Sequence, residues 1–294
     1  MSQASLKVLV TGGTGFIGSR LIPRLQSKGH TVTIVSRTPG AGRITYEDIQ
    51  NGKLPRSDAI VNLAGAPIMD AAWTPQRKKE LLDSRVATTN ILTKALEEMK
   101  NEERPKVFVS GSAIGIYPFT DDPVDESFDK KFSAELCREW ELSAIRVPNP
   151  TRLVILRIGI VLGEGGGALS QMVPPFRFGL GGPMGSGRQF QPWIHIDDMC
   201  KLIEKSIEDS KMEGVYNAVS PGIVSNGELS KVIADTLGRP MFLWVPRLLL
   251  KTVFGEREIL LTEGSNVVPK RTVESGFQFD YPNIEGAMKQ ILKK

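Results

Sequence analysis

The chain is poor in the residues that build disulfide frameworks and metal centres. Its 294 residues include two cysteines, Cys137 and Cys200, which lie far apart and in no C-x-x-C spacing. This usage is typical of a reducing compartment and argues against a disulfide framework. The two histidines, His30 and His195, are equally isolated. No set of cysteines and histidines has the spacing of a zinc site, so the sequence predicts no metal.

Long apolar runs and blocks of one charge are missing as well. No stretch of about 18 uncharged apolar residues occurs, and Arg157 interrupts the best candidate at 153–162. Residues 1–5 are polar and lack the basic and apolar regions of a signal peptide. The net charge is only +4, and the basic residues are scattered. We therefore expect a soluble, cytoplasmic protein with no membrane and no nucleic-acid partner.

The first half of the chain alternates between two kinds of segment. Short apolar runs predict buried strands at residues 6–10, 31–36, 59–63, 106–110 and 152–158. Helical spacing lies between them, at residues 16–28, 75–100 and 131–145. Strands that alternate with helices of this length predict an α/β fold of the Rossmann type, with a doubly wound parallel sheet.

The second half of the chain does not continue this regular alternation of strands and helices. Residues 163–167 and 179–187 are glycine-rich and predict loops. Residues 193–196 predict a strand that returns to the sheet, followed by a helix at 198–209. Ser225 and Glu228 match a capping box at the start of a further helix. We expect a Rossmann domain over residues 1–164, with 193–219 returning to it, and a smaller C-terminal α/β domain over 165–294 that faces a substrate.

A glycine-rich turn follows the first predicted strand and opens the first predicted helix. Its sequence at residues 13–18, Gly-Thr-Gly-Phe-Ile-Gly, has GxGxxG spacing. In this setting glycine permits the tight turn, and the free N–H groups of the helix can meet a pyrophosphate. A glycine-rich turn without a ligand is the alternative. We predict dinucleotide contacts from Gly12, Thr14, Gly15, Phe16, Ile17 and Gly18.

The end of the second predicted strand indicates which dinucleotide binds. An NAD site usually has an acidic residue there to hold the ribose hydroxyls. This chain instead has Ser36 and Arg37, then Arg43, and no acid before Glu47. Arginine can hold a 2′-phosphate through charge-assisted hydrogen bonds, whereas a carboxylate would repel it. The pattern predicts NADP(H), with contacts from Ser36, Arg37 and Arg43, and the alternative is that Arg37 is simply solvated.

Several motifs occur in a characteristic order. They are TGGTGFIG at 11–18, NLAG at 62–65, SGSA at 110–113, RIGIVLG at 157–163 and WIHIDD at 193–198. Together they resemble the extended and atypical short-chain dehydrogenase/reductases, in particular the epimerase-like proteins of unassigned substrate. The resemblance runs from residue 6 to residue 292.

This resemblance implies a dinucleotide across the carboxyl ends of the strands. Leu63, Ala64 and Gly65 would pass under the adenosine and its ribose, and Val161 would contact the nicotinamide end. Glu80 and Arg85 match positions that line the cofactor, where a carboxylate can accept from ribose hydroxyls and a guanidinium can reach a phosphate. The alternative for Glu80 and Arg85 is a plain exposed charge pair. The resemblance also permits a homodimer through the helices at 75–100 and 131–145.

The chain departs from the family at the expected proton-transfer residues. The superfamily usually uses a serine and a Tyr-x-x-x-Lys pair, but none of the four tyrosines here precedes a lysine at that spacing. The tyrosine and lysine positions fall near Phe132 and Leu136, or one residue later at Ser133 and Cys137.

Two nearby hydroxyls are the candidate catalytic groups. Ser112 stands where the family's serine lies, so we predict that it orients a substrate oxygen. Tyr117 or an ordered water would be the proton donor. The alternatives are a serine that binds nearby backbone and a tyrosine packed in a loop.

These observations predict an NADP(H)-dependent oxidoreductase that transfers a hydride to or from an unidentified carbonyl or alcohol substrate. A non-catalytic NADPH-binding sensor is the alternative, because the Tyr-x-x-x-Lys pair is absent. The glycine-rich stretch that ends in Arg188 and Gln189 would either close over the substrate or form a structural loop. His195, among apolar neighbours, is interpreted as a structural histidine.

Overall fold

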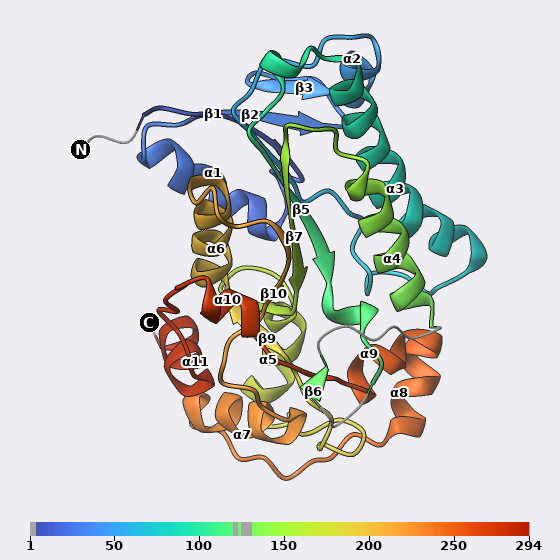
Figure 1. The fold of residues 1–294 in the computed structure, drawn as a ribbon. Coiled ribbons are helices and arrows are strands. Elements are labelled where there is room, and N and C mark those ends of the chain that lie inside the picture. The colour runs from blue at the N-terminus through green and yellow to red at the C-terminus, as the bar shows by residue number, and fades with distance from the viewer. Residues whose placement is uncertain (1–3, 120–122, 125–130, 294) are drawn as a thin grey trace.

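A seven-stranded sheet forms the centre of the molecule in a computed structural model, which describes residues 4–119, 123–124 and 131–293 (Figure 1). Its order is β10-β7-β5-β4-β1-β2-β3, and every neighbouring pair runs parallel. The strands are β1 (Lys7–Thr11), β2 (Thr31–Ser36), β3 (Arg43–Thr45), β4 (Ala59–Asn62), β5 (Val107–Ala113), β7 (Arg152–Ile158) and β10 (Gly214–Ala218). The chain winds outward from β1 in one direction and then crosses to β4 and winds in the other. The predicted doubly wound fold is therefore confirmed, with its switch point between β1 and β4.

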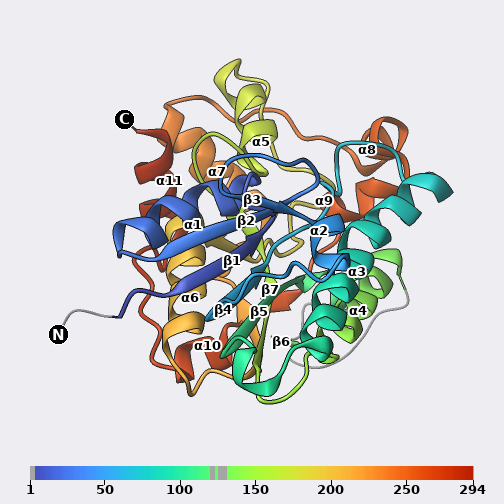
Figure 2. The same ribbon diagram turned by 90° about the horizontal axis from the view of Figure 1, so that it is seen from above.

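Helices cover both faces of this sheet (Figures 1 and 2). One face carries α1 (Phe16–Ser27) and α6 (Ile196–Glu208), and the other carries α2 (Tyr46–Gln50), α3 (Pro75–Glu98) and α4 (Phe132–Ile145). The strands are apolar on both sides, as a parallel sheet between two helical layers requires. Alternate residues of β1 show this, because Val8 and Val10 pack with α1 and α6 while Leu9 packs with α3.

Most of the C-terminal segments lie beyond the carboxyl ends of β5 and β7, whereas residues 270–274 pack beside β10, where Arg271 donates to Val215 O and Glu213 O (Figure 1). Their helices are α5 (Leu169–Arg177), α7 (Asn226–Leu237), α8 (Arg247–Phe254), α9 (Ile259–Thr262), α10 (Lys270–Glu274) and α11 (Ile284–Leu292). Two small sheets join them, one of β8 (Ile160–Leu162) with β9 (Trp193–His195) and one of β6 (Pro123–Val124) with β11 (Asn266–Val267). A separate apolar cluster around Trp193 holds α5, α7 and α11 together.

Most predicted elements lie within a few residues of the observed ones. The capping box is also present, since Ser225 Oγ accepts from Glu228 N at 3.2 Å and Glu228 Oε2 accepts from Ser225 N at 2.7 Å. The division of the chain into two domains stays a prediction.

The strand expected at residues 193–196 is placed wrongly by the sequence. β9 does not return to the main sheet but pairs with β8, and the strand that does return is β10, beside β7. The following helix also begins earlier than expected, at Ile196. The cause is His195, whose Nδ1 accepts from Asp197 N at 3.1 Å and so caps the helix.

A buried carboxylate fastens α1 to α6. Glu204 accepts from Arg24 Nε at 2.6 Å and lies 2.8 Å from Lys28 Nζ. Burial alone would raise the pKa of Glu204, but the hydrogen bonds from these two cations lower it below the ordinary value. The ion pair therefore stabilises the fold at neutral pH, and this contribution is lost as the pH falls through the lowered pKa.

We expect Glu204→Gln to lower the free energy of unfolding by about 2–4 kcal/mol at pH 7, because two cations lose their buried partner. The difference from wild type should narrow when the pH falls below the ordinary glutamate pKa. Denaturant unfolding of the variant and of wild type, at pH 7 and at a pH below the ordinary glutamate pKa, measures this difference. Glu208→Gln is the matched control, because Glu208 makes a more exposed contact with Lys28. An equal loss in both variants would contradict the prediction.

Candidate functional site

The glycine-rich turn after β1 lies directly against the chain that leaves β4. Gly12 has φ +66°, and a Cβ atom there would lie 2.6 Å from Leu63 O. A Cβ atom at Gly18 would lie 2.4 Å from Gly12 O. Gly15 N donates to Gly12 O at 2.9 Å and closes the turn. Only glycine fits at positions 12 and 18, so the two strand ends approach each other backbone to backbone.

The start of α1 is suited to an anion. Its N-cap is Gly15, no side chain caps it, and no acidic residue lies in its first turn. The first N–H groups of the helix and the positive end of its dipole therefore have no side-chain acceptor. Thr14 and Gly15 are exposed at this end, whereas Ile17 and Gly18 face inward.

Phe16 has a packing role in addition to its predicted cofactor contact. Its ring lies among the glycines of the 163–167 loop, where a Cβ atom at Gly166 would be 2.6 Å from Phe16 Cδ2. A Cβ atom at Gly167 would be 2.7 Å from Phe16 Cε1 and 2.9 Å from Val161 O. This contact brings Val161, on β8, to the same end of the sheet as α1.

A buried hydrogen-bond chain fixes the segment after β4, and the sequence analysis missed it. Thr11 Oγ1 donates to Asn62 Oδ1 at 2.7 Å and accepts from Leu63 N and Ala64 N, each at 3.0 Å. Asn62 Nδ2 then donates to Thr89 Oγ1 at 2.8 Å. The sequence signal that could have revealed this chain of hydrogen bonds is that Thr11 and Asn62 are polar residues at the ends of two otherwise apolar strands.

Arg85 lies over Gly65 at this edge of the sheet. A Cβ atom at Gly65 would lie 2.9 Å from Arg85 Cζ, and the guanidinium donates to Leu81 O and Ala66 O, each at 3.0 Å. Burial lowers the pKa of Arg85. Glu80 is exposed and pairs with Arg77 at 2.7 Å. Because Glu80 pairs with Arg77, the alternative of a Glu80–Arg85 charge pair is wrong, and the cofactor contacts of both residues stay predictions.

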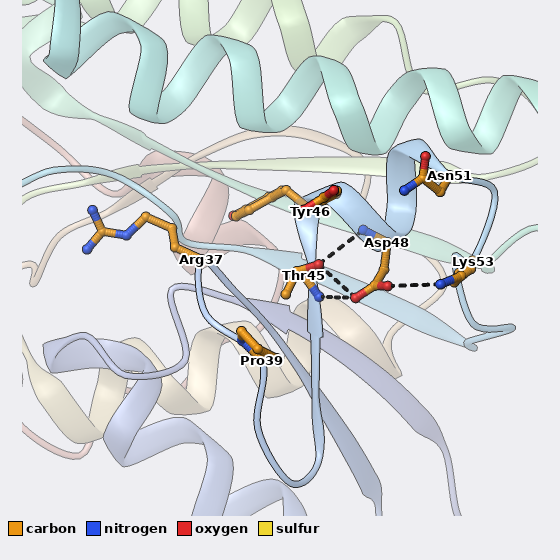
Figure 3. Close-up of a pocket in the computed structure, with 8 residues that line it drawn as sticks. Arg37, Pro39, Thr45, Tyr46, Asp48, Asn51 and Lys53 are labelled. Atoms are coloured by element: carbon orange, nitrogen blue, oxygen red, sulfur yellow. Dashed lines mark hydrogen bonds and ion pairs between the residues drawn. The ribbon is translucent and has the colours of Figure 1, made fainter.

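Arg37 stands at the carboxyl end of β2, beside a cavity of about 540 Å³ (Figure 3). Its side chain is exposed and forms no ion pair with any described residue. Figure 3 shows it directed away from Asp48, which is held by Thr45 and Lys53. The Tyr46 phenol, whose pKa is raised by burial, lines the same cavity. Glu47 and Asp48 also line this cavity, but neither forms an ion pair with Arg37, so its guanidinium is available to an anion.

The other two predicted residues near Arg37 are placed differently. Ser36 Oγ is bonded to the backbone of Thr38, from whose N–H it accepts at 3.2 Å. Arg43 lies opposite Ile34 in the sheet register, two residues before the carboxyl edge. The Arg43 side chain lies against the loop after Arg37, because a Cβ atom at Gly40 would be 3.2 Å from Arg43 Cδ. The cofactor contacts of Ser36, Arg37 and Arg43 stay predictions.

Ser112 and Tyr117 belong to one buried polar network. Ser112 Oγ donates to Glu141 Oε1 at 2.6 Å, and Arg157 donates to both Glu141 oxygens at 2.8 and 2.9 Å. Arg157 Nη1 donates to the Tyr117 hydroxyl at 2.9 Å, which in turn donates to Asn217 Oδ1 at 2.8 Å. The network joins β5, α4, β7 and β10 across the end of the sheet.

The directions of these hydrogen bonds limit what the hydroxyls can do. Arg157 has only donors, so the single hydrogen of Tyr117 is directed to Asn217. The carboxylate of Glu141 is acceptor-only, so the single hydrogen of Ser112 is directed to it. Both hydroxyl residues are only 2% exposed. Burial would lower the pKa of Arg157, but its bonds to Glu141 and Tyr117 raise it above the ordinary value.

The first turns of α4 contain the two pairs of residues that the sequence analysis set against the family's tyrosine and lysine. A Cβ atom at Gly115 would lie 3.4 Å from Ser133 Cβ and 3.8 Å from Cys137 Sγ. The later of the two possible registers, Ser133 and Cys137, therefore faces the end of β5. Burial raises the pKa of the Cys137 thiol to about 12. This pair offers neither a phenol nor an ammonium group.

The glycine-rich loop that ends at Gln189 is held in place. Gln189 Nε2 donates to Met184 O at 2.9 Å and to Leu261 O at 2.8 Å. Trp244 Nε1 donates to Gly185 O at 2.5 Å. These bonds favour the structural-loop interpretation over a closing lid. His195 also has a structural environment, because its ring caps α6 and its Nε2 lies 3.0 Å from Gln290 Oε1.

Within residues 4–119, 123–124 and 131–293, no group of three or more His, Cys, Asp or Glu side chains is placed to hold a metal ion. In the same part of the chain, no helix has both the length and the apolar character needed to cross a membrane.

Comparison with known proteins identifies the family. Residues 8–218 match the NAD dependent epimerase/dehydratase family, and residues 245–291 match a domain of unknown function, DUF1731. The chain belongs to the NAD-dependent epimerase/dehydratase family, which confirms the resemblance seen in the motifs.

Two curated relatives extend over the whole chain. The epimerase family protein SDR39U1 of Mus musculus is 42% identical over 98% of this chain and 100% of its own length. The epimerase family protein YfhF of Bacillus subtilis is 33% identical over 98% of both chains.

Solved structures of other proteins have the same fold as this chain. The crystal structure of human SDR39U1 (isoform 2) with NADPH has a TM-score of 0.94 at 41% identity, covering 98% of this chain and 99% of that one. UDP-N-acetylglucosamine 4-epimerase from Bacillus cereus has a TM-score of 0.75 at 20% identity, covering 98% and 95%, and shares the fold.

We expect Gly12→Ala to weaken NADPH binding at least about tenfold, because a methyl group would push the turn away from Leu63 and shift the start of α1. Isothermal titration measures this. Gly29→Ala is the matched control, since Gly29 also has a positive φ, of +85°, but nothing lies within 4 Å of its Cβ position. Equal NADPH affinities for the two variants would show that the close approach is unimportant for binding.

Proposed function

We propose that this protein binds NADP(H) and acts as an oxidoreductase that transfers a hydride to or from a small carbonyl or alcohol substrate. The observation that carries the proposal is the combination of an uncapped α1 N-terminus with an unpaired Arg37 at the end of β2. NADPH in the crystal structure of human SDR39U1 supports the choice of cofactor.

The site residues fit the parts of this cofactor. The N–H groups that open α1 would hold the pyrophosphate, and Arg37 would hold the 2′-phosphate, which an NAD site would instead exclude with an acid. Bound NADPH supplies a hydride at its nicotinamide ring. The adenosine and nicotinamide ends would be lined by Leu63, Ala64, Gly65 and Val161.

The buried network supports a specific role for Ser112 in this proposal. Because its hydrogen is committed to Glu141, Ser112 Oγ has only lone pairs to offer. It would therefore accept a hydrogen bond from a substrate hydroxyl and hold the alcohol form of the substrate. Tyr117 would have to break its bond to Asn217 before giving up a proton. Of the two proton donors proposed from the sequence, this arrangement favours an ordered water.

The second candidate is a protein that binds NADPH without turnover and senses the cofactor. The observation that favours it is that Ser133 and Cys137 are the residues of α4 that face the end of β5, and neither is a tyrosine or a lysine. A cytoplasmic location and a homodimer through α3 and α4 stay predictions under either candidate.

Side-by-side titration with NADPH and NADH tests the cofactor proposal. We expect NADPH to bind at least about tenfold more tightly, a difference of about 1.4 kcal/mol. Arg37→Asp should remove this preference, because a carboxylate repels the 2′-phosphate. Lys94→Asp is the control, because it makes the same change in charge at an exposed position on α3. Equal binding of both nucleotides by wild type would refute the role of Arg37.

A screen for NADPH oxidation with aldehydes, ketones and quinones separates the two candidates. If a substrate is turned over, we expect Ser112→Ala to lower kcat/KM about tenfold or more, because the substrate oxygen loses its positioning contact. Undiminished turnover would remove Ser112 from the mechanism. Tight NADPH binding with no oxidation by any compound would instead favour the sensor.

A further inference from the structure

The exposed apolar side chains of this protein are gathered in one region. Eleven large hydrophobic side chains are exposed among the described residues, and eight of them fall at residues 178–180 and 242–253. Phe242 is 85% exposed, Phe178 81% and Leu248 75%. Soluble proteins scatter such residues singly, so a cluster of this kind marks a binding surface. We call these eight residues the apolar face.

The two segments of the apolar face lie side by side. A Cβ atom at Gly182 would lie 1.8 Å from Leu243 O, and Gly185 N donates to Val245 O at 3.0 Å. The Trp244 ring is anchored to Gly185 through its Nε1. Beyond Trp244, α8 continues the face with Leu248, Leu249 and Val253, and Figures 1 and 2 place this helix at the edge of the molecule.

The charges near the apolar face that have no ion-pair partner in the described chain are cations, because the flanking carboxylates of Asp235 and Glu256 already pair with Lys231 and Lys78. Residues 165–196 and 236–255, which contain the face, include no aspartate or glutamate. Arg177, Arg239 and Lys251 are exposed there, and none of them pairs with a carboxylate of the described chain. Arg247 is the exception, because Glu258 and Glu263 already neutralise it. The face therefore combines protruding aromatic and leucine side chains with unpaired cations.

We propose that the apolar face binds the surface of a membrane that contains anionic lipid. Aromatic and leucine side chains enter the boundary between headgroups and acyl chains, and nearby lysine and arginine attract anionic headgroups. α8 carries exposed Leu248, Leu249 and Val253 together with Lys251, a composition that suits a helix lying in the plane of the interface. A second copy of the chain is a poorer partner, because the same cations would face each other.

The shape of the face supports the same choice. Side chains as exposed as Phe178, Phe242 and Leu248 protrude into solvent. A protein partner would need a matching pocket for each of them, whereas fluid acyl chains rearrange around any protruding group. The contact does not involve the proposed cofactor residues, so it is independent of NADP(H) binding.

Vesicle flotation tests the proposal with the full chain. We expect wild type to float with vesicles of phosphatidylcholine and phosphatidylglycerol, and to stay behind with phosphatidylcholine alone. Phe242→Ser/Leu248→Ser should reduce the bound fraction about tenfold, because it removes the apolar anchor. Arg239→Glu/Lys251→Glu should do the same by removing the attraction to the headgroups. Added salt should weaken wild-type binding.

Controls separate the apolar face from general effects. Leu142→Ser/Val273→Ser removes two exposed apolar side chains elsewhere and should float like wild type. NADPH titration and circular dichroism show that each variant is folded. No flotation of wild type with anionic vesicles would overturn the proposal, as would equal flotation of the Phe242→Ser/Leu248→Ser variant. A dimer that this variant dissociates, without flotation of wild type, would assign the face to a second copy instead.

Discussion

The site depends on a contact between two pieces of backbone that leaves no room for side chains. The turn at Gly12 and the segment at Leu63 come within van der Waals distance, and Thr11 locks them together by accepting from the N–H groups of residues 63 and 64. The direction of α1 follows from this contact, because the turn leads straight into the helix. Its partner α6 is held in turn by Glu204. The uncapped N-terminal end of α1, where we propose that the pyrophosphate binds, is thus fixed by contacts with the sheet.

The second organising feature is the buried Glu141–Arg157 ion pair, which holds Ser112 at the end of β5. Glu141 accepts the hydroxyl hydrogen of Ser112. Arg157, which Glu141 holds, donates to the Tyr117 oxygen, so the Tyr117 hydrogen is directed elsewhere. Buried pairs of this type cost desolvation and are kept when they impose one arrangement on their surroundings. Here the pair and its hydrogen bonds fix β5, α4, β7 and β10 relative to one another. Any chemistry at this site must therefore work with hydroxyls that accept hydrogen bonds more readily than they donate them.

The sequence predicted those parts of the structure that depend on residues close to one another in the chain, such as strand bounds and tight turns. The strands at 31–36 and 152–158 have the predicted bounds, and the glycine turn lies between β1 and α1, because apolar runs and glycine spacing act within a few residues. α5 was missed, since Pro174 and Pro175 disfavour a helix. β9 was assigned to the wrong sheet, and the partners of Arg85 and Tyr117 were not foreseen. Those outcomes depend on neighbours that are distant in the sequence, such as Asn217, a hundred residues from Tyr117.

The ring of Phe16 couples two segments that are distant in the sequence. Gly163, Gly166 and Gly167 surround this ring so closely that their loop takes its shape from it. A change in the size of this ring would therefore disturb the loop, although the two are far apart in the sequence. The path of the chain after β8 thus depends on a single side chain of the first helix.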